Sequence, residues 1–478
     1  MAGKNLSFLH KLGLWVSLLT LGTCATGYNA IIQDTEKLYY SGNYDAAIPK
    51  IRSLANDSDN KDRLLYLMEA GMIFHTKGDY ESSNKAFMDA ENVADNIKVS
   101  VTRQGLSFLL SDNESNFTGE DFERVLIKFY IALNYIFLGE FENAKIYFRR
   151  LDVELREMKY VQGKYKQNLF ARYLDAVLSE TLSRYNDARV QYKNILEIEP
   201  SFSQIKGDKY VLAVKENDSR TQAALASNQN LVTAFNRNMQ PVPYNTKMGE
   251  VIIINQAGKA AVKESRGKLL NDQFFASSLK VSLDSSIRAK GGASSAGVTA
   301  SGVLAMMASA ENPIPIYKVR DPKSAAVKPI LLGGRQVGTT TIMNDYSDTA
   351  MKSFNENYNT IVAKNVASIA VKLVAAAIAS EALSKEIKKN QKNELAGSLI
   401  SLGVGLAAGY AASSTIAPDL RSWHLLPSNY QVKRMHLEPG EYTIELPGSK
   451  LPDGSSSIKV MVESGKVTFL NYRTFVEE

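Results

Sequence analysis

A serine and a lysine three positions apart are the first candidates for chemistry in this 478-residue sequence. Ser277 and Lys280 have the spacing at which a lysine activates a serine nucleophile. The same spacing recurs at Ser82 and Lys85 and again near the C-terminus, and no Lys-Thr-Gly sequence accompanies it. We therefore interpret the pattern as chance and predict no nucleophilic catalysis at these residues.

A glycine-rich run and two histidines are the other candidates for a chemical site. The run from Gly292 to Gly297 has the glycine spacing of a phosphate-binding loop, but Val298 stands where that loop needs a lysine. His424 and His436 flank a polar segment and could form a pocket. We favour the other interpretation, in which Trp423 anchors this segment on a long helix and both histidines lie at the surface. With four histidines and one cysteine in the chain, a zinc site is not expected. The sequence predicts no metal, no cofactor and no enzymatic activity.

Cys24 is the only cysteine, and it follows a segment with the order of a secretory signal. A basic start, the uncharged run from Leu12 to Leu21 and small residues precede it. This arrangement resembles the lipobox of bacterial lipoproteins, in which the thiol is acylated and becomes the first residue of the mature chain. The resemblance implies lipid attachment at Cys24 and, through Ala25, sorting to the outer membrane with the protein facing the periplasm. An ordinary cleavable signal that releases the protein to the periplasm, and an uncleaved anchor, are the alternatives.

Composition sets the limits for the rest of the chain. About 455 residues follow the leader, enough for two or three domains of ~150 residues each. A net charge of +6 is dilute over this length and gives no reason to expect nucleic acid as a partner. A single cysteine also excludes an internal disulfide, so burial alone must stabilise the fold.

A glycine-x-aromatic pattern recurs between residues 30 and 200. In each copy a turn residue ends one helix, an aromatic residue opens the next and a small residue allows close helix packing, as in tetratricopeptide (TPR) repeats. The aromatic positions are 36, 61 and 44 residues apart, against about 34 in a regular array, so we expect irregular units with an insertion between Asp95 and Glu120. The residues that carry the pattern are Gly42, Tyr44, Ala47, Gly78, Tyr80, Phe87, Gly139, Phe141, Ala144, Phe148, Tyr185, Ala188, Tyr192 and Pro200.

Such repeats stack into a curved solenoid whose concave surface binds peptides or other proteins. The alternative interpretation is an ordinary helix bundle, because glycine, an aromatic residue and alanine also mark helix starts there.

The C-terminal half has a different character. Strands are predicted at 251–254, 280–283, 314–319 and 339–343, and a long helix is predicted from about Asp345, with Val362, Val366, Ile369 and Leu373 on one stripe. A charged connector at 385–392 leads to a second helix at 394–412, and alternation in the last 40 residues or so predicts a small antiparallel sheet.

The second helix lies in a stretch without charge, 395–418, and contains the small-residue series Ser401, Gly405 and Gly409. Its length would allow membrane insertion, but alanine, glycine and serine contribute little transfer free energy. We favour close helix packing over insertion. The basic run at 385–389 is interpreted as a solvated helix end, with contact to anionic lipid as the alternative.

These patterns divide the chain into six parts. They are a signal peptide at 1–23, a lipidated tether at 24–29, TPR-like helical repeats at 30–235, a strand-rich region at 241–345, a helical hairpin at 346–412 and a small β region at 413–478. The predicted fold class is α+β: an all-α TPR-like solenoid followed by a mixed domain with a long helix and a small antiparallel sheet.

Several short motifs of the C-terminal half resemble an uncharacterised family of bacterial TPR-bearing envelope lipoproteins. They are Gly249-Glu250-Val251-Ile252-Ile253 with Gly258 and Lys263-Glu264, then Pro315-Ile316-Tyr317, Asn344-Asp345, Asp419-Leu420-Arg421-Ser422-Trp423, Leu426-Pro427 and Pro439-Gly440-x-Tyr442. The resemblance spans nearly the whole mature chain. It implies an envelope lipoprotein and brings no reaction with it.

The resulting hypothesis is a non-enzymatic scaffold that binds envelope proteins or peptides through its solenoid and reaches the membrane through its lipid. An oligomerising structural subunit of an envelope or surface assembly, and an activator of cell-wall synthesis, are the alternatives. A homo-oligomer is compatible with each of them.

Overall fold

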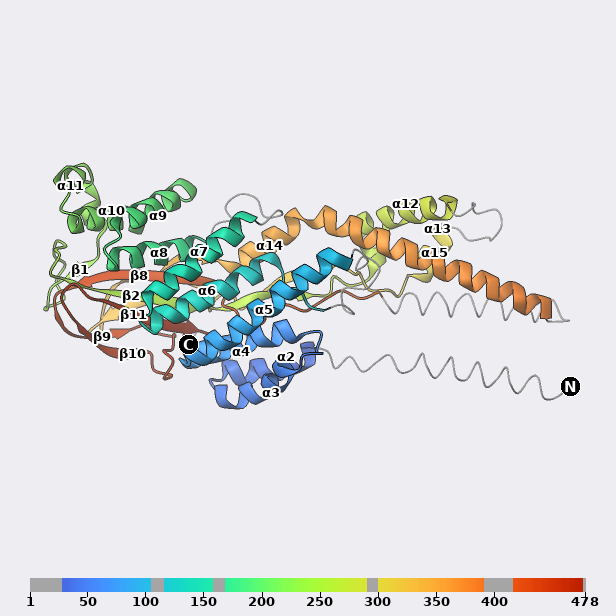
Figure 1. Cartoon of the computed structure of the whole chain (residues 1–478), viewed down its shortest axis with the longest axis horizontal. Helices are drawn as coiled ribbons and strands as arrows, with labels where there is room; N and C mark the ends of the chain where they lie inside the picture. Colours follow the sequence, from blue (N-terminus) through green and yellow to red (C-terminus); the bar gives the residue numbers. More distant parts are fainter. Residues whose placement is uncertain (1–27, 105–115, 158–167, 290–299, 391–415, 476–478) are drawn as a thin grey trace.

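The N-terminal half of this computed structural model is a row of antiparallel helices (Figure 1). The structure describes residues 28–104, 116–157, 168–289, 300–390 and 416–475. The helices of this half are α2 (Tyr28–Tyr40), α3 (Tyr44–Asn56), α4 (Arg63–Lys77), α5 (Tyr80–Gln104), α6 (Asp121–Phe137), α7 (Phe141–Glu157), α8 (Leu169–Thr181), α9 (Tyr185–Ile198), α10 (Ser203–Lys215) and α11 (Ser219–Ala224), with the 3₁₀ helix η5 (Ala226–Leu231).

Tight turns join the members of each helical hairpin. Gly78 follows α4 with a φ of +87°, and Gly42 and Gly139 hold the same left-handed conformation, which only glycine adopts without strain. Ser183 takes this conformation in the fourth copy at a φ of 58°. The aromatic residue two positions later is in each case the first residue of the next helix, namely Tyr44, Tyr80, Phe141 and Tyr185.

The small and aromatic positions of the pattern lie between the helices. Ala47, Ala144 and Ala188 are fully buried, and Phe87, Phe148 and Tyr192 are buried beside neighbouring helices. Pro200 lies in the turn between α9 and α10 and interrupts the helical course there.

The C-terminal half contains three sheets. The largest has the strand order β1-β8-β2-β11, with β7 also paired to β8, and β11 runs parallel to β2 whereas β8 runs antiparallel to it. Its strands are β1 (Ala234–Phe235), β2 (Gly249–Ala257), β7 (Thr341–Asp345), β8 (Asn429–Leu437) and β11 (Val467–Thr474). The second sheet is antiparallel, in the order β10 (Ser457–Val462), β9 (Gly440–Glu445), β5 (Pro329–Leu332), β6 (Arg335–Thr339). The third pairs β3 (Lys259–Glu264) with β4 (Ile316–Arg320).

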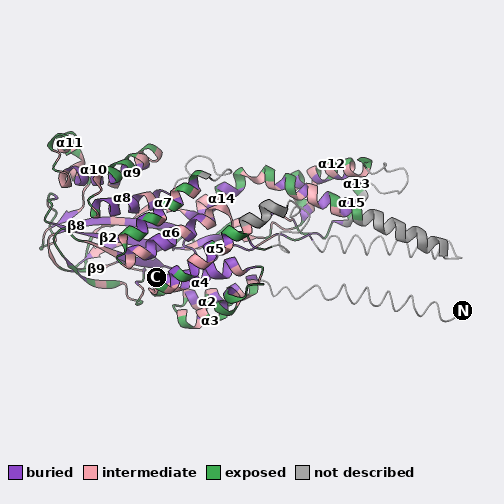
Figure 2. Cartoon of the chain, viewed as in Figure 1, coloured by how far each residue is buried: buried purple, intermediate pink, exposed green. Residues whose placement is uncertain are grey.

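The large sheet is the middle layer of the molecule, and β2 is buried along its whole length (Figure 2). Because successive side chains of a strand point to opposite faces, Ile252 and Ile254 pack with the helices whereas Val251 and Ile253 pack with the second sheet. A continuous apolar strand is what burial on both faces requires. Helices, large sheet and small sheet therefore form three layers around two apolar cores.

An arm projects from this body (Figure 1). It contains α12 (Gln273–Ala289), α13 (Ala300–Met306) and α15 (Tyr358–Asn390), and it is joined to the body through α14 (Tyr346–Glu356). The arm has an apolar core of its own, in which Leu279 and Leu283 of α12 are buried in one cluster with Val366 and Ile369 of α15.

Two predictions for this region are wrong. Residues 280–283, predicted as a strand, belong to α12, because Phe275, Leu279 and Leu283 recur at helical spacing and pack on α15. Residues 385–390, predicted as a connector, continue α15. The second helix predicted at 394–412 lies outside the described residues.

The fold class is confirmed as a helical-repeat half followed by an α+β half with a long helix and a small antiparallel sheet. Among the described residues, none of the helices combines the length and apolar character needed to cross a membrane.

Candidate interaction surfaces

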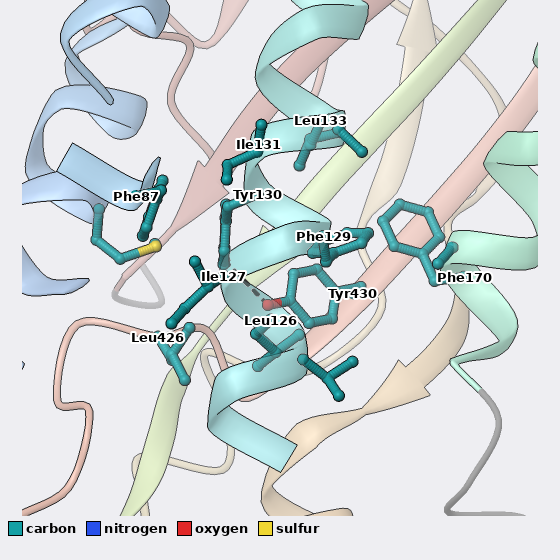
Figure 3. Packing of buried hydrophobic residues seen from close by; sticks show 14 of the residues in the cluster. Phe87, Leu126, Ile127, Phe129, Tyr130, Ile131, Leu133, Phe170, Leu426 and Tyr430 are labelled. Atoms are coloured by element: carbon teal, nitrogen blue, oxygen red, sulfur yellow. Dashed lines mark hydrogen bonds between the residues drawn. The ribbon is translucent and has the colours of Figure 1, made fainter. Parts of the chain in front are cut away.

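The inner helices of the repeat half face the chain's own sheet. Most residues of α4, α6 and α8 are buried, and these helices share one apolar cluster with β2 and β8. Figure 3 shows Tyr430 of β8 packed between Phe129 of α6 and Phe170 of α8. The prediction that the concave face is an open docking surface is therefore wrong, because the large sheet needs an apolar layer on each face and takes the solenoid as one of them.

A chain of polar contacts crosses the same interface. The Tyr130 hydroxyl donates to Oε1 of Gln256 (2.9 Å), and the Gln256 amide lies 2.7 Å from Nε2 of His75 and 2.8 Å from Oδ1 of Asn471. Nδ1 of His75 lies 2.6 Å from Oδ1 of Asn134. Burial lowers the pKa of His75 to about 4, so the imidazole is neutral and serves as a link in this network.

Arg434 forms a second polar link between the halves. Its guanidinium, fully buried, contacts Glu180 of α8 at 2.7 Å and Glu250 of β2 at 2.5 Å, and Lys215 of α10 bonds both carboxylates. Burial opposes their ionisation, yet Arg434 and Lys215 lower the pKa of both glutamates. Burial raises the pKa of neighbouring Asp208 to about 7, with Arg434 opposing the rise. Each of these two cations and two glutamates has a partner, so the cluster joins the two halves.

The segment Asp419–Leu426 has no regular secondary structure, turns at His424 and Leu425, and lies against the helices. Carboxylates hold its backbone: Glu123 accepts from the N–H of Trp423 (2.8 Å), and Glu69 accepts from the N–H groups of His424 (2.7 Å) and Leu425 (3.1 Å). Tyr28 donates to the carbonyl of Ser422 (2.9 Å).

The side chains of this segment contradict the expected placement. Trp423 is fully buried against Phe87 and Tyr130 of α5 and α6, not against the long helix. His424 and His436, interpreted as surface residues, are both buried, and burial lowers the pKa of each. A burial signal was visible in the apolar neighbours of Trp423, but the surface that covers it comes from residues some 300 positions away.

The serine–lysine pair that was considered for catalysis lies on a single helix. Ser277 and Lys280 both lie on α12, and Oγ of Ser277 donates to the carbonyl of Phe274 (3.0 Å) within that helix. Over the part of the chain that the structure describes, no group of three or more His, Cys, Asp or Glu could hold a metal ion. The glycine-rich run at 292–297, Cys24 and the whole signal region lie outside the described residues.

One surface pocket lies beside the first helix. It has a volume of about 500 Å³ and is lined by Gln33, Glu36, Lys37, Tyr40, Lys259, Arg320 and Asp321. Arg320 is already bonded to Glu36, to the carbonyl of His424 (2.6 Å) and to that of Ala260 (2.7 Å). Lys259 lies 4.4 Å from the centre of the Tyr40 ring. Arg320 and Lys259, the cations described here, thus already contact other residues of the protein.

A second pocket lies on the outer side of the repeats, and we call it the outer groove. It has a volume of about 360 Å³ and is lined by Glu91, Asp95, Lys128, Arg149, Arg150, Val153 and Glu154 of α5, α6 and α7. Lys128 bonds Glu154 (2.6 Å) and Glu91 (3.1 Å), and Arg150 bonds Glu91 (2.7 Å). These ion pairs fix the floor of the groove.

The exposed face of α7 forms one wall of the outer groove. Ile146 and Val153 are about half-exposed and seven residues apart, so both lie on one side of the helix, with Arg149 and Arg150 between them. The Arg150 guanidinium lies 4.8 Å from the centre of the Tyr147 ring. Arginine and tyrosine are among the residue types that are enriched at protein interfaces and their hot spots.

The solved structures reported below each cover less than half of this chain. No family model matches the chain, and no curated protein matches it. Among solved structures, MamA from Desulfovibrio magneticus RS-1 is similar at 11% identity over 43% of this chain and 97% of its own, with a TM-score of 0.30. A Podospora anserina kinesin light chain with TPR-like repeats is similar at 9% identity over 42% of this chain and 92% of its own, with a TM-score of 0.31. PilF from Pseudomonas aeruginosa is similar at 17% identity over 46% and 85%, with a TM-score of 0.29.

Proposed function

We propose that this chain is a non-enzymatic interaction protein, held at the cell envelope by a lipid on Cys24, that binds protein partners on the outer side of its helical repeats. The observation that carries the proposal is the exposed face of α7 beside the outer groove, since the inner face is already filled by the chain's own sheet. The large sheet keeps the inner helices rigid, so the outer helices present a preformed surface. Preformed surfaces bind with a smaller loss of conformational entropy.

The chemistry of the outer groove suits a protein segment with an aliphatic side chain and a carboxylate. Val153 and Ile146 provide the apolar contact, and Arg149 is exposed and makes no ion pair with any residue that the structure describes. A carboxylate that approaches Arg149 gains a charge-assisted hydrogen bond, which planar guanidinium groups favour. The expected partner is therefore an envelope protein with an acidic, apolar surface segment.

Crosslinking in envelope membranes tests this surface. We expect that the double variant Arg149→Glu, Val153→Ser loses the partners that the wild-type chain captures, because both the charge and the apolar contact are removed. The matched control is Arg335→Glu, Met461→Ser, an exposed cation and an exposed aliphatic residue on β6 and β10 of the other half. Equal partner recovery from both variants would place the binding surface elsewhere.

The lipid anchor has a separate test. Palmitate should label the wild-type chain and leave Cys24→Ser unlabelled, and the labelled protein should fractionate with the outer membrane. Equal labelling of both chains would end the anchor proposal and leave the protein as a periplasmic one, without affecting the outer groove.

A further inference from the structure

The arm carries an exposed apolar face that the core of the fold does not use. On α12, Phe275, Leu279 and Leu283 point into the core of the arm. Phe274 and Val281 are seven residues apart on the opposite side, and their exposed fractions are 52% and 67%. Single exposed aliphatic residues are ordinary, but an aromatic and a branched residue on one outward face of a projecting helix mark a contact surface.

The charges around this face are mostly positive. Lys280 and Arg288 of α12 are exposed, and Asp284 is the one acidic residue of α12. Apolar residues flanked by cations are typical of helices that lie in the interface of an anionic membrane.

The position of the arm relates it to the proposed anchor. The helix α2 begins at the end of the body from which α15 projects (Figure 1). Tyr28, its first residue, bonds Ser422 (2.9 Å), six residues after Ile416, which is buried in the core of the arm. Cys24 lies four residues before Tyr28, and four extended residues span at most ~14 Å. The 33-residue α15 is ~50 Å long. A bilayer held at Cys24 would therefore meet the arm.

We propose that the outward face of α12 is a membrane-contact surface that binds an anionic phospholipid bilayer, with Phe274 and Val281 in the acyl boundary and Lys280 and Arg288 at the headgroups. The inference rests on the proposed envelope location and names the lipid surface as a second partner. An acyl chain and an amphipathic surface together hold a protein at a membrane more firmly than one acyl chain alone.

Vesicle binding without the acyl chain tests the arm directly. The probe is the chain from residue 24 onward with Cys24→Ser, mixed with vesicles of phosphatidylethanolamine and phosphatidylglycerol and, separately, of phosphatidylcholine. We expect binding to the anionic vesicles. Phe274→Ser with Val281→Ser should weaken it about tenfold, because their apolar burial is lost. Lys280→Gln with Arg288→Gln should remove the preference for anionic lipid.

The matched control is Val190→Ser with Met461→Ser, which are 57% and 62% exposed on α9 and β10 of the body. This control should bind vesicles as the parent does, and all variants should melt at the parent temperature because every changed side chain is exposed. The proposal would be overturned if the control weakened vesicle binding as much as Phe274→Ser with Val281→Ser does. It would also be overturned if the parent did not bind vesicles.

Self-association is the competing explanation for the exposed face. If lipid-free parent protein has a dimer mass that the Phe274→Ser, Val281→Ser variant loses, the face binds a second copy and the membrane proposal is wrong. The outcome is independent of the anchor test. Vesicle binding together with absent palmitate labelling would keep the arm proposal and discard the lipidated cysteine.

Discussion

At the scale of single residues, several buried acids are held at the boundary between the two halves. Burial raises the pKa of Glu69 to about 8, although it accepts hydrogen bonds from Tyr28 and two backbone N–H groups. Burial also raises the pKa of Glu123 and of Asp208 to about 7. These groups keep protons in the folded chain that they release in the unfolded chain, so each stabilises the fold less as the pH rises through its folded pKa.

The sign of the pH dependence follows from these shifts. Burial lowers the pKa values of His75 and His436 to about 4 and about 3. Between about pH 4.5 and 6.5, these histidines therefore add stability as the pH rises and offset the stability lost through the acids with raised pKa values. Above pH 6.5 these histidines are neutral in both the folded and the unfolded chain. Of the groups named here, only the acids then differ in protonation between the two states. We expect the free energy of unfolding to fall by about 3 kcal/mol from pH 6.5 to pH 8, measured by urea denaturation at each pH.

The variant Glu69→Gln should flatten this decline, because an amide carries no proton to lose. Its control is Glu81→Gln, an exposed glutamate of α5 that should leave the pH profile unchanged. A wild-type stability that rises from pH 6.5 to pH 8 would contradict the argument.

At the scale of elements, the close contact between α4 and α5 depends on one glycine. A Cβ built on Gly71 would lie 2.5 Å from the Phe87 ring, closer than real carbon contacts allow. Phe87 in turn packs on Tyr130 and Trp423, so it has little room to move. We expect Gly71→Ala to lower the free energy of unfolding by about 1–3 kcal/mol, as other overpacked cores do.

The double variant Gly71→Ala, Phe87→Leu provides the test of cause. If the clash is responsible, Gly71→Ala should lower the free energy of unfolding by less in the Phe87→Leu background than in the wild type. A double-mutant cycle measures this difference. Additive effects would show that helix propensity or another contact decides the outcome.

The elements also show what the sequence could predict. Local patterns predicted the helical hairpins, since a glycine with positive φ and an aromatic helix start are set by neighbouring residues. The same reasoning mistook 280–283 for a strand, because a short apolar run there was weighed without its partners Phe275 and Leu279. The contacts of Glu69, Glu123 and Arg434 could not be predicted, since they join residues hundreds of positions apart and no local period encodes them.

At the scale of the whole molecule, the repeat half and the sheet half form one body. The inner helices are covered by β2 and β8, and Arg434 and the segment Asp419–Leu426 tie the same surfaces with buried polar bonds. Removing the sheet would expose the apolar faces of α4, α6 and α8 and take Arg434 away from Glu180, leaving Lys215 as its cation. The exposed faces are the costly change, because large apolar patches drive association.

We therefore expect neither half to be stable alone. Residues 28–231 expressed by themselves should aggregate or bind a hydrophobic dye, whereas co-expression with residues 232–478 should give a soluble one-to-one complex. The division falls after η5 and before β1, where only the connecting backbone is cut. As the control, a full chain carrying a protease site at this point should stay associated after cleavage and melt in one transition. A monomeric, cooperatively folded 28–231 fragment would show instead that the solenoid is an independent domain, and its inner face would again become available to a partner.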